Sequence, residues 1–212
     1  MSEFGPNLAG LDTKGRILEA ARWLFWEHGY EGTSLGDITG RADVNSGSLY
    51  YFFKTKEELL LAVLDAYTEL LWPEVIEPAF RRTDDPIARI FAILEGYRQG
   101  LILTGCTHGC PIGNLALEVG DALPRARAKI ASNFEGWKGW IRKCLEEAAG
   151  RLPEKSDSTA LATFVLSVME GGVMQARAHQ DLAPFETSVK QLQHYFDCLL
   201  EQGRREQAKK VM

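Results

Sequence analysis

The sequence predicts an all-α protein of about nine helices, with a small N-terminal helix-turn-helix domain followed by a larger helical domain. Apolar residues recur every three or four positions along most of the chain, which is the period of an amphipathic helix. Helix-capping patterns and prolines separate these periodic segments. No segment shows the apolar-polar alternation of a half-buried strand, so no sheet is expected.

The composition suits a folded chain with a sizeable core. Of 212 residues, 45% are hydrophobic and 25% are charged, which is enough for one large domain or two small ones. There is no run of roughly 18 apolar residues, and the N-terminus lacks the pattern of a secretory signal. Neither a membrane span nor secretion is therefore expected. The four cysteines are too few and scattered for a disulfide framework, which favours the reducing cytoplasm.

Three short helices are predicted near the N-terminus. The apolar face of the first is formed by Ile17, Ala20, Ala21, Leu24 and Phe25. Gly29 offers this helix a C-terminal cap. A capping box that starts at Ser34 places the second helix at about Leu35 to Arg41. Asn45 is a suitable N-cap for a third helix through Phe52.

Six more helices are predicted further along. Their expected spans are residues 56–71, 86–103, a short helix ending at 119, 123–149, 158–178 and 185–202. A capping box at Thr55 opens the first of them, and Pro73 and Pro78 end or kink it. Asp85 and Pro86 open the second. The charged segment that follows residue 202, GRREQAKK, is expected to fray.

The second and third helices are joined by only four residues, ADVN, which predicts a tight helix-turn-helix. Such a unit presents its second helix outward, where it can enter a DNA major groove. Val44 and Leu49 are expected to pack inward. The residues expected to point away are Ser46, Gly47, Ser48, Tyr50 and Tyr51. Lys54 and Lys56 follow, where they can neutralise phosphate charge.

The charge distribution favours a local DNA-binding patch over a generally basic surface. The formal net charge is −5, and the first 60 residues hold nine acidic against six basic side chains. From Val44 to Lys56, in contrast, there are two lysines and no acidic residue. Any contact with DNA is therefore expected to use this segment.

The segment from Thr13 to about Leu60 resembles the DNA-binding domain of the TetR family of bacterial transcriptional repressors. The matching residues are Ile17, Ala20, Leu24, Phe25, Gly29, Tyr30, Thr33, Ser34, Ile38, Ala42, Val44, Gly47, Ser48, Leu49, Tyr50, Tyr51, Phe52, Lys54 and Lys56. The resemblance implies an all-α homodimer. Its small domain would bind a palindromic operator in double-stranded DNA, and its larger domain would hold a ligand pocket.

The resemblance also implies roles for individual residues. The start of the second helix would touch phosphates, the exposed turn of the third helix would read the DNA, and Lys56 would hold the backbone. The predicted DNA-binding set is Thr33, Ser34, Asn45, Ser46, Gly47, Ser48, Tyr50, Tyr51, Lys54 and Lys56.

Two positions depart from the family pattern. Asp43 stands where the turn usually has glycine, but aspartate tolerates a left-handed backbone, so the turn is expected to persist. Phe52 replaces a histidine that many members carry, which removes one polar contact. Because the third helix also lacks arginine and glutamine, we expect few bidentate base contacts and more readout of shape, methyl groups and backbone.

Most of the aromatic residues follow Lys56, and core packing explains most of them. The family pattern adds a cavity for a small, mostly apolar molecule, enclosed by helices between residues 56 and 149. Such cavities need aromatic walls and a few polar groups. The expected lining residues are Tyr97, His108, Asn114 and Trp137. No cofactor and no metal are expected.

The stretch Cys106-x-His108-x-Cys110 has three open interpretations. It can be a structural turn with buried cysteines, which is favoured because buried cysteine behaves as a small apolar residue. It can be a thiol switch for oxidants or electrophiles. It can be a zinc site, although no fourth ligand is near. An all-α enzyme with a Cys–His pair is a further alternative, but it lacks a companion carboxylate, so no enzyme is expected.

The expected organisation is a flexible tail at residues 1–10, a DNA-binding domain at 11–55 and a ligand-binding and dimerisation domain at 56–205. The last two predicted helices are expected to pair with their copies in a homodimer, with burial inside the monomer as the alternative. The predicted function is a repressor that a small apolar or aromatic ligand releases from its operator. A thiol-based sensor that uses Cys106 and Cys110 is the alternative.

Overall fold

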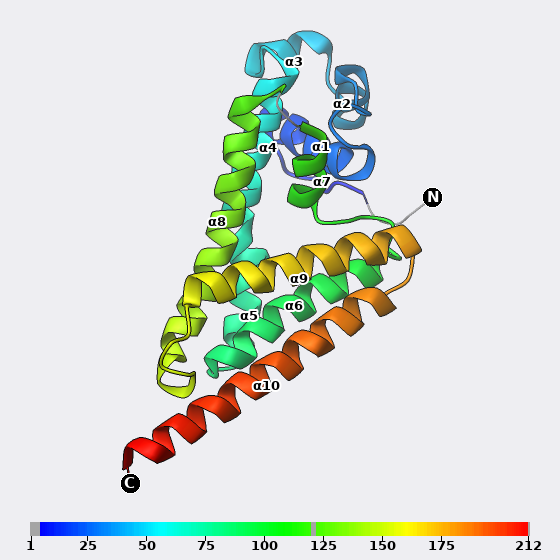
Figure 1. The fold of residues 1–212 in the computed structure, drawn as a ribbon. Helices are drawn as coiled ribbons and strands as arrows, with labels where there is room; N and C mark the ends of the chain where they lie inside the picture. The colour runs from blue at the N-terminus through cyan, green and yellow to red at the C-terminus, as the bar shows by residue number, and fades with distance from the viewer. Residues whose placement is uncertain (1–4, 120–121, 212) are drawn as a thin grey trace. The chain divides into compact units, whose positions relative to one another are not determined.

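The computed structural model describes residues 5–119 and 122–211, and these residues form α-helices and no strand (Figure 1). The helices are α1 (Thr13–His28), α2 (Leu35–Ala42), α3 (Ser46–Phe52), α4 (Lys56–Leu70), α5 (Glu77–Arg82), α6 (Pro86–Leu103), α7 (Pro111–Val119), α8 (Pro124–Glu147), α9 (Ser158–His179) and α10 (Ala183–Val211). The all-α prediction is confirmed. Each predicted helix has a counterpart, and the short helix α5 is additional.

Local caps explain where several helices begin. Asp37 N–H donates to the Ser34 hydroxyl at 3.1 Å, and Ser34 N–H donates to the Asp37 carboxylate at 2.8 Å, so the predicted capping box is complete. The side chain of Asn45 accepts a hydrogen bond from Ser48 N–H at 2.8 Å at the start of α3. Asp85 caps α6 in the same way. Each cap satisfies an N–H group that the first helical turn leaves without a partner.

Both ends of α4 differ in detail from the expected pattern. Glu58 N–H donates to the Thr55 hydroxyl at 3.0 Å, but the Glu58 carboxylate accepts from Lys54 N–H, one residue before the expected partner. A π-helical segment, Leu71–Ile76, follows α4 and leads into α5. Pro73 lies in this segment and has no N–H to donate, so the α-helical hydrogen-bond ladder cannot continue through it.

The described residues form two compact units. The first contains the residues up to Glu69 together with Cys110–Asn133. In this unit, α1 packs against α2, α3 and α7. Its core includes Ile17, Ala20, Leu24, Phe25, Ile38, Leu49, Leu59 and Leu60. The helix-turn-helix therefore packs on an apolar core that it shares with the rest of this unit.

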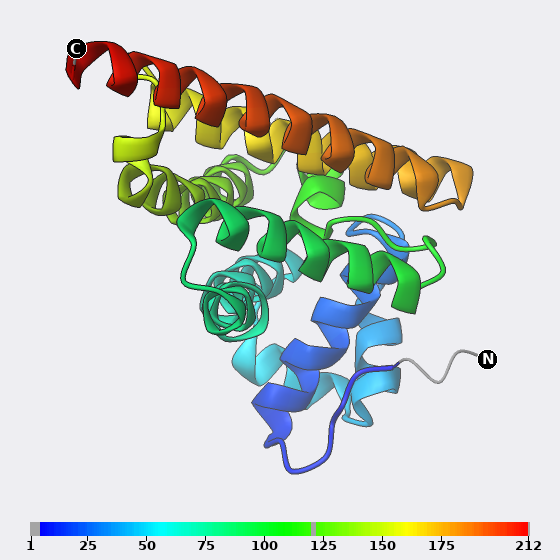
Figure 2. The ribbon, with the colours of Figure 1, turned by 90° about the horizontal axis from the view of Figure 1, so that it is seen from below.

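The second unit contains Leu70–Gly109 and the chain from Phe134 onward. Within it, α9 and α10 lie side by side in opposite directions, and α6 packs against both (Figures 1 and 2). A Cβ atom at Gly172 would lie 3.1 Å from the ring of Phe185, so glycine permits the close approach of α9 and α10. Phe185 and Phe196 of α10 are buried.

Helix α9 is the one described helix whose length and composition would allow it to cross a membrane, with a mean hydropathy of 1.2. The core helix of a folded domain has the same character. In this chain the apolar face of α9 packs against α6 and α10. The buried residues of that face are Leu161, Ala162, Val165, Met169, Gly172, Val173 and Ala176.

The charged C-terminal segment does not fray, so that prediction was wrong. Helix α10 continues through it because the segment has partners far back in the sequence. The Glu206 carboxylate accepts from Glu154 N–H at 3.0 Å, and Lys210 pairs with the Glu154 carboxylate at 2.8 Å. Gly203 lies against the carbonyl of Arg151, closer than any side chain would allow. Sequence periodicity carries no signal of such contacts.

Candidate DNA-binding surface and effector site

The turn between α2 and α3 is held by its own backbone and by α1. Asp43 adopts the left-handed conformation, with φ 51° and ψ 55°. Val44 N–H donates to the carbonyl of Thr39 at 3.1 Å. The guanidinium of Arg16 donates to the Asp43 carbonyl at 2.9 Å and pairs with its carboxylate at 3.1 Å. The turn thus persists without glycine, as expected, and Arg16 fixes it to α1.

One face of α3 is exposed and the opposite face is anchored in the core. Leu49 is fully buried, whereas Tyr50 is 49% exposed and Tyr51 is 74% exposed. Ser46 and Gly47 are exposed as well. Ser48, which was predicted to point away, and Val44, which was predicted to pack inward, are both half-buried. The exposed face of α3 therefore has small residues at its N-terminal end, followed by two tyrosines.

Both predicted lysines have defined positions next to this face. The Lys54 ammonium donates to the carbonyl of Tyr50 at 2.8 Å and to that of Tyr51 at 3.4 Å, so it caps the C-terminal end of α3. The Lys56 ammonium lies 4.2 Å from the centroid of the Tyr30 ring, a cation–π contact. Two positive charges are thus fixed where α3 ends and α4 begins.

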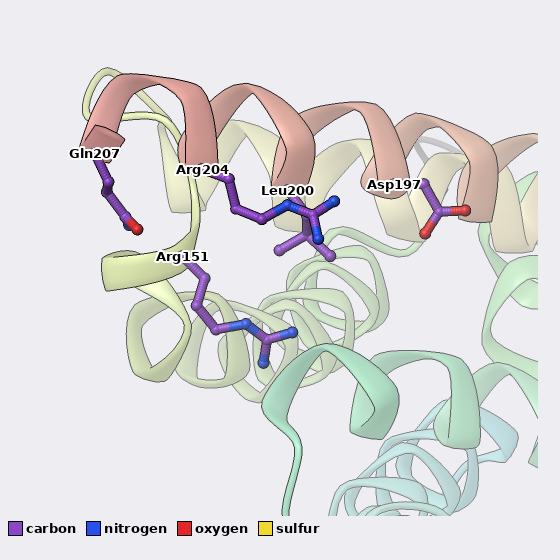
Figure 3. Close-up of a pocket in the computed structure, with 5 residues that line it drawn as sticks. All are labelled: Arg151, Asp197, Leu200, Arg204 and Gln207. Atoms are coloured by element: carbon purple, nitrogen blue, oxygen red, sulfur yellow. The ribbon is translucent and has the colours of Figure 1, made fainter. Parts of the chain in front are cut away.

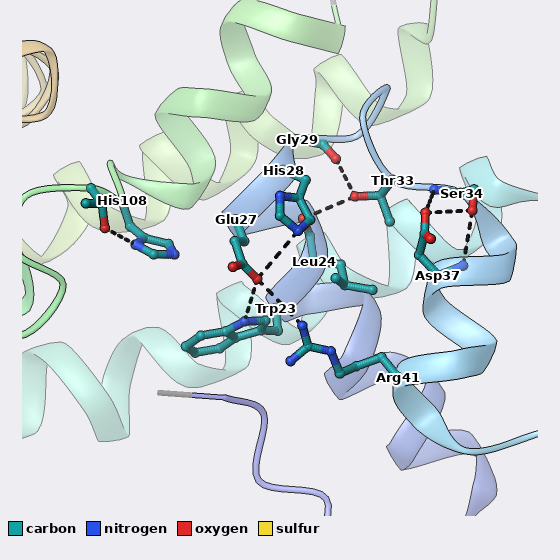
Figure 4. A network of polar contacts seen from close by, with 11 residues as sticks. Trp23, Leu24, Glu27, His28, Gly29, Thr33, Ser34, Asp37, Arg41 and His108 are labelled. Carbon is teal, nitrogen blue, oxygen red and sulfur yellow. Dashed lines mark hydrogen bonds and ion pairs between the residues drawn. The ribbon is translucent and has the colours of Figure 1, made fainter. Parts of the chain in front are cut away.

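Thr33, which was predicted to contact DNA, is buried and stabilises the loop before α2. Thr33 is 1% exposed, and its hydroxyl donates to the carbonyls of Leu24 at 3.1 Å and Gly29 at 2.8 Å (Figure 4). Ser34 is exposed, although its hydroxyl takes part in the capping box with Asp37. Thr33 therefore anchors the loop before α2, and Ser34 is the residue of the pair that faces solvent.

A polar cluster on α1 involves an exposed basic residue of α2. The Glu27 carboxylate accepts a hydrogen bond from the indole N–H of Trp23 at 3.0 Å and lies 3.9 Å from the guanidinium of Arg41 (Figure 4). His28 lies 3.7 Å from the same carboxylate. The cluster helps to hold α1 and α2 together, and its ion pair between Glu27 and Arg41 was not predicted from the sequence.

The predicted effector residues fall in both units. Tyr97 and Trp137 meet in the second unit, with ring centroids 6.3 Å apart in a T-shaped arrangement. Trp137 is 4% exposed, and its indole nitrogen has no hydrogen-bond partner among the described residues. His108 belongs to the same unit, and its Nδ1 lies 2.8 Å from the Thr107 hydroxyl. Asn114 belongs to the first unit, and its buried amide nitrogen likewise lacks a described partner.

Three of the four cysteines are buried, as structural cysteines are. All four are reduced, with Cys106, Cys110 and Cys144 buried and Cys198 exposed. Burial, with a smaller effect of Asp181, raises the pKa of the Cys106 thiol, and burial raises that of Cys144 to about 11. A raised pKa disfavours the reactive thiolate. Among the described residues, no three potential metal ligands gather at one place.

An open cleft of about 420 Å³ lies in the second unit at the C-terminal part of α10 (Figure 3). It is lined by Arg151, Asp197, Leu200, Arg204 and Gln207. Both guanidinium groups already have partners, since Arg151 pairs with Asp85 at 2.6 Å and Arg204 with Glu201 at 2.8 Å. None of the predicted effector residues lines this cleft.

An exposed second helix of a helix-turn-helix, flanked by lysines and attached to a larger helical unit, defines a DNA-binding regulator. Residues 17–63 match the family of bacterial regulatory proteins of the tetR type. Residues 86–191 match the C-terminal domain of LmrA/YxaF-like transcriptional regulators. The chain belongs to the TetR family and is a DNA-binding transcriptional regulator of the LmrA/YxaF-like group.

Individual relatives agree with this assignment. An uncharacterized HTH-type regulator from Lactococcus lactis subsp. lactis is 26% identical over 186 residues, which cover 88% of this chain and 94% of that protein. The HTH-type transcriptional repressor DhaR from Mycobacterium sp. (strain GP1) is 25% identical, covering 84% and 89%. The crystal structure of a TetR regulator from Chloroflexus aurantiacus has a TM-score of 0.76 and 27% identity, covering 87% and 94%. The relatives are regulators, a class without enzymes.

Proposed function

We propose that the protein is a cytoplasmic repressor: a homodimer that binds a palindromic operator and is released by a small apolar ligand. The DNA-binding part of the proposal rests on the exposed face of α3. The segment from Val44 to Lys56, which includes α3, contains two lysines and no acidic residue. The relative DhaR is named a repressor, which supports that direction of control. The few, scattered cysteines favour the reducing cytoplasm.

In this proposal, α3 reads the operator. Ser46, Gly47 and Ser48 are small and allow close approach to the groove, while Tyr50 and Tyr51 offer hydroxyls to phosphates and rings to thymine methyl groups. A Cβ at Gly47 would lie 3.2 Å from the capping oxygen of Asn45, so a side chain there would crowd the cap. Asn45 contributes by fixing the start of the helix.

The proposed phosphate contacts surround this reading face. Ser34 and the first turn of α2 face one backbone strand, because helix N-termini attract anions. Lys54 and Lys56 supply positive charge at the other end of α3. Thr33 is left out of the contact surface, because its hydroxyl is buried and bonded to two carbonyls.

The proposed effector site lies beside Tyr97 and Trp137. A buried donor without an acceptor destabilises a protein by about 1–3 kcal/mol, so the indole N–H of Trp137 suits a ligand that supplies an acceptor. The ring of Tyr97 suits an apolar or aromatic body. The expected effector is therefore an apolar molecule with a carbonyl or similar acceptor. His108, in the same unit, remains a proposed contact on the grounds of the family pattern.

A comparison of paired compounds tests the effector class. Aromatic ketones and the corresponding hydrocarbons are to be added to the protein bound to labelled operator DNA, and release is followed by fluorescence anisotropy. The ketones are expected to release the DNA more effectively. Trp137→Phe keeps an aromatic ring but removes the N–H, so it should abolish this preference. A preference that survives in Trp137→Phe would count against the site.

The proposed dimer uses a stripe of small and apolar residues on α9. Its residues are Ala160, Phe164, Ser167, Gly171, Met174 and Ala178. The alternating spacing of four and three residues is that of a helix-bundle seam. In the single chain Phe164 is 44% exposed and Met174 is 56% exposed, and the Phe164 ring packs against that of Tyr195 of α10. Pairing with a second copy would bury these side chains.

Operator binding by the dimer is tested by stoichiometry on a duplex selected from random DNA. The two α3 helices are expected to contact half-sites whose centres lie one or more helical turns apart, roughly 34 Å per turn. Titration should therefore saturate at an even number of chains per duplex, on a dyad-symmetric sequence. Saturation by one chain on an asymmetric sequence would contradict the proposal. An effector can shift this binding only through its differential affinity for two states, typically about 1–3 kcal/mol.

A further inference from the structure

We infer that Glu118 of α7 positions the loop between α1 and α2 and thereby couples α7 to the orientation of the helix-turn-helix. This inference rests on the proposed function, and it assigns a regulatory role to a residue far from α3 in the sequence. Glu118 accepts two backbone hydrogen bonds, from Tyr30 N–H to Oε2 at 2.8 Å and from Glu31 N–H to Oε1 at 2.7 Å.

The contact has the geometry of a specific clamp. Two adjacent amides use the two oxygens of one carboxylate, and hydrogen bonds to a charged acceptor are stronger than those between neutral groups. Gly29 makes the approach possible, because a Cβ there would lie 2.7 Å from both oxygens of Glu118. Gly29 also has φ 79°, which disfavours any other residue. The loop is therefore shaped around this carboxylate.

The clamped loop supports the parts of the unit that the DNA-binding proposal uses. The carbonyl of Gly29 accepts the hydroxyl of Thr33, which is followed directly by the cap of α2. The Tyr30 ring lies 5.5 Å from that of Phe25 in α1, and the Lys56 ammonium at the start of α4 lies over it. A displacement of Glu118 would move the backbone that holds the first turn of α2 and the base of α4.

Helix α7 is suited to transmit a signal because of its place in the chain. It falls within the residues that match the C-terminal family model, 86–191, yet it belongs to the compact unit of the helix-turn-helix. Its buried residues Ile112, Leu115 and Val119 fix it in that unit, and α7 packs against α1. A stretch of effector-domain sequence is thus built into the DNA-binding unit, and Glu118 supplies its charged contact.

The contact is tested first without DNA or ligand, by amide hydrogen exchange of the full chain. Glu118→Ala and Glu118→Gln are compared with Glu69→Gln, which makes the same charge change as the glutamine variant at an exposed residue of the same unit. Both the Tyr30 and Glu31 amides should exchange faster by about tenfold or more in Glu118→Ala, and one of the two in Glu118→Gln, whereas Glu69→Gln should leave both unchanged. Unchanged exchange in both variants would overturn the clamp.

The coupling is tested with the selected operator duplex as the probe. In the wild-type protein, the duplex should slow amide exchange in α7, residues 111–119, because coupling between two sites is reciprocal. In Glu118→Ala the duplex should still bind, but the effect on α7 should disappear, while Glu69→Gln behaves as wild type. An equal effect on α7 in Glu118→Ala, or no effect in the wild type, would overturn the inference.

The two failures are distinguishable. If no duplex binds the wild-type protein, the proposed function fails, while the exchange of the Tyr30 and Glu31 amides still tests the clamp. If Glu118→Ala does not fold, Glu118→Gln takes its place, since it keeps the side-chain volume. The glutamine presents one amide nitrogen to a backbone N–H, so one of the two hydrogen bonds is lost.

Discussion

The residues that support or form the proposed DNA-binding surface are of two kinds. In the first kind, the side-chain polar groups form hydrogen bonds with the backbone of the chain itself, as in Thr33, Asn45 and Lys54. Tyr50 and Tyr51 instead expose their side chains to solvent. Substitution of the first kind should therefore change stability together with DNA binding, whereas substitution of the tyrosines should change DNA binding alone.

Tyr50→Ala is expected to weaken operator binding by about tenfold, because it removes a hydrogen bond to a charged phosphate together with ring contacts. The thermal unfolding midpoint and the dimer should be unchanged, since half of the Tyr50 surface is exposed. Fluorescence anisotropy with the selected duplex measures the affinity. Leu117→Ala, which trims an exposed side chain of α7, is the control and should bind as the wild type does. Equal affinity of Tyr50→Ala and the control would remove Tyr50 from the contact surface.

The capping box at Ser34 predicts a specific acid dependence. Hydrogen bonds from the Ser34 side chain and backbone hold the pKa of Asp37 below its usual value. A lowered folded pKa contributes stability that is present above the unfolded pKa of about 3.9 and is lost as the pH falls through the folded pKa. The stability difference between the wild type and Asp37→Asn should therefore shrink as the pH falls below about 4. Urea unfolding at neutral and acidic pH measures it, and a constant difference would contradict the assignment.

Single-residue properties could be predicted from the sequence only where their cause was local. The outward face of α3 followed from helical spacing, and the tolerance of Asp43 for a left-handed backbone followed from its chemistry. The contacts of Glu118 and Arg16 could not be predicted in this way. Their partners are 88 and 27 positions away along the chain and include backbone groups. Every residue type has such groups, so the sequence does not indicate which of them will be contacted.

At the scale of helices, local caps and long-range contacts account for different boundaries. The starts of α2, α3 and α6 follow from Ser34, Asn45 and Asp85, and all were predicted. The end of α10 was not, because it depends on contacts to residues before α9. The short helix α5 was also missed, since the sequence showed that Pro73 interrupts α4 but not how the chain resumes afterwards.

A pair of glycine substitutions tests the docking of the C-terminal part of α10. Gly203→Ala should destabilise the protein by about 1–3 kcal/mol, because its Cβ would meet the backbone at Arg151 and Leu152. Gly96→Ala in α6 has open space around its Cβ and should stabilise the protein by up to about 1 kcal/mol through helix propensity. Chemical denaturation measures both. A neutral Gly203→Ala would show that the end of α10 does not dock as described.

For the whole molecule, the proposed function needs a dimer, because one α3 helix reads only half of a palindrome. The single chain leaves Phe164, Met174 and Tyr195 exposed on the paired helices α9 and α10. Their exposure gives the second copy a surface to cover. The homodimer was expected mainly from the family resemblance, and the face of α9 proposed for it lies away from the side that packs against α6 and α10.

Phe164→Glu is expected to weaken the dimer by at least about tenfold, since it would bury a charge in the seam. Operator binding should fall with it, because a monomer holds only one half-site. Thr159→Glu is the control: it adds the same charge near the start of α9, away from the stripe, where the helix dipole favours it. Analytical ultracentrifugation measures the association. A Phe164→Glu protein that remains a dimer would exclude this face as the interface.

The proposed function depends above all on recognition of a symmetric operator by α3. The most direct measurement is selection of bound duplexes from a random DNA pool by the purified protein, in parallel with a Tyr50→Ala, Tyr51→Ala double variant. The wild type should yield a dyad-symmetric consensus, whereas the variant should show weak or no enrichment. The same consensus enriched equally by both proteins, or no consensus with the wild type, would contradict it.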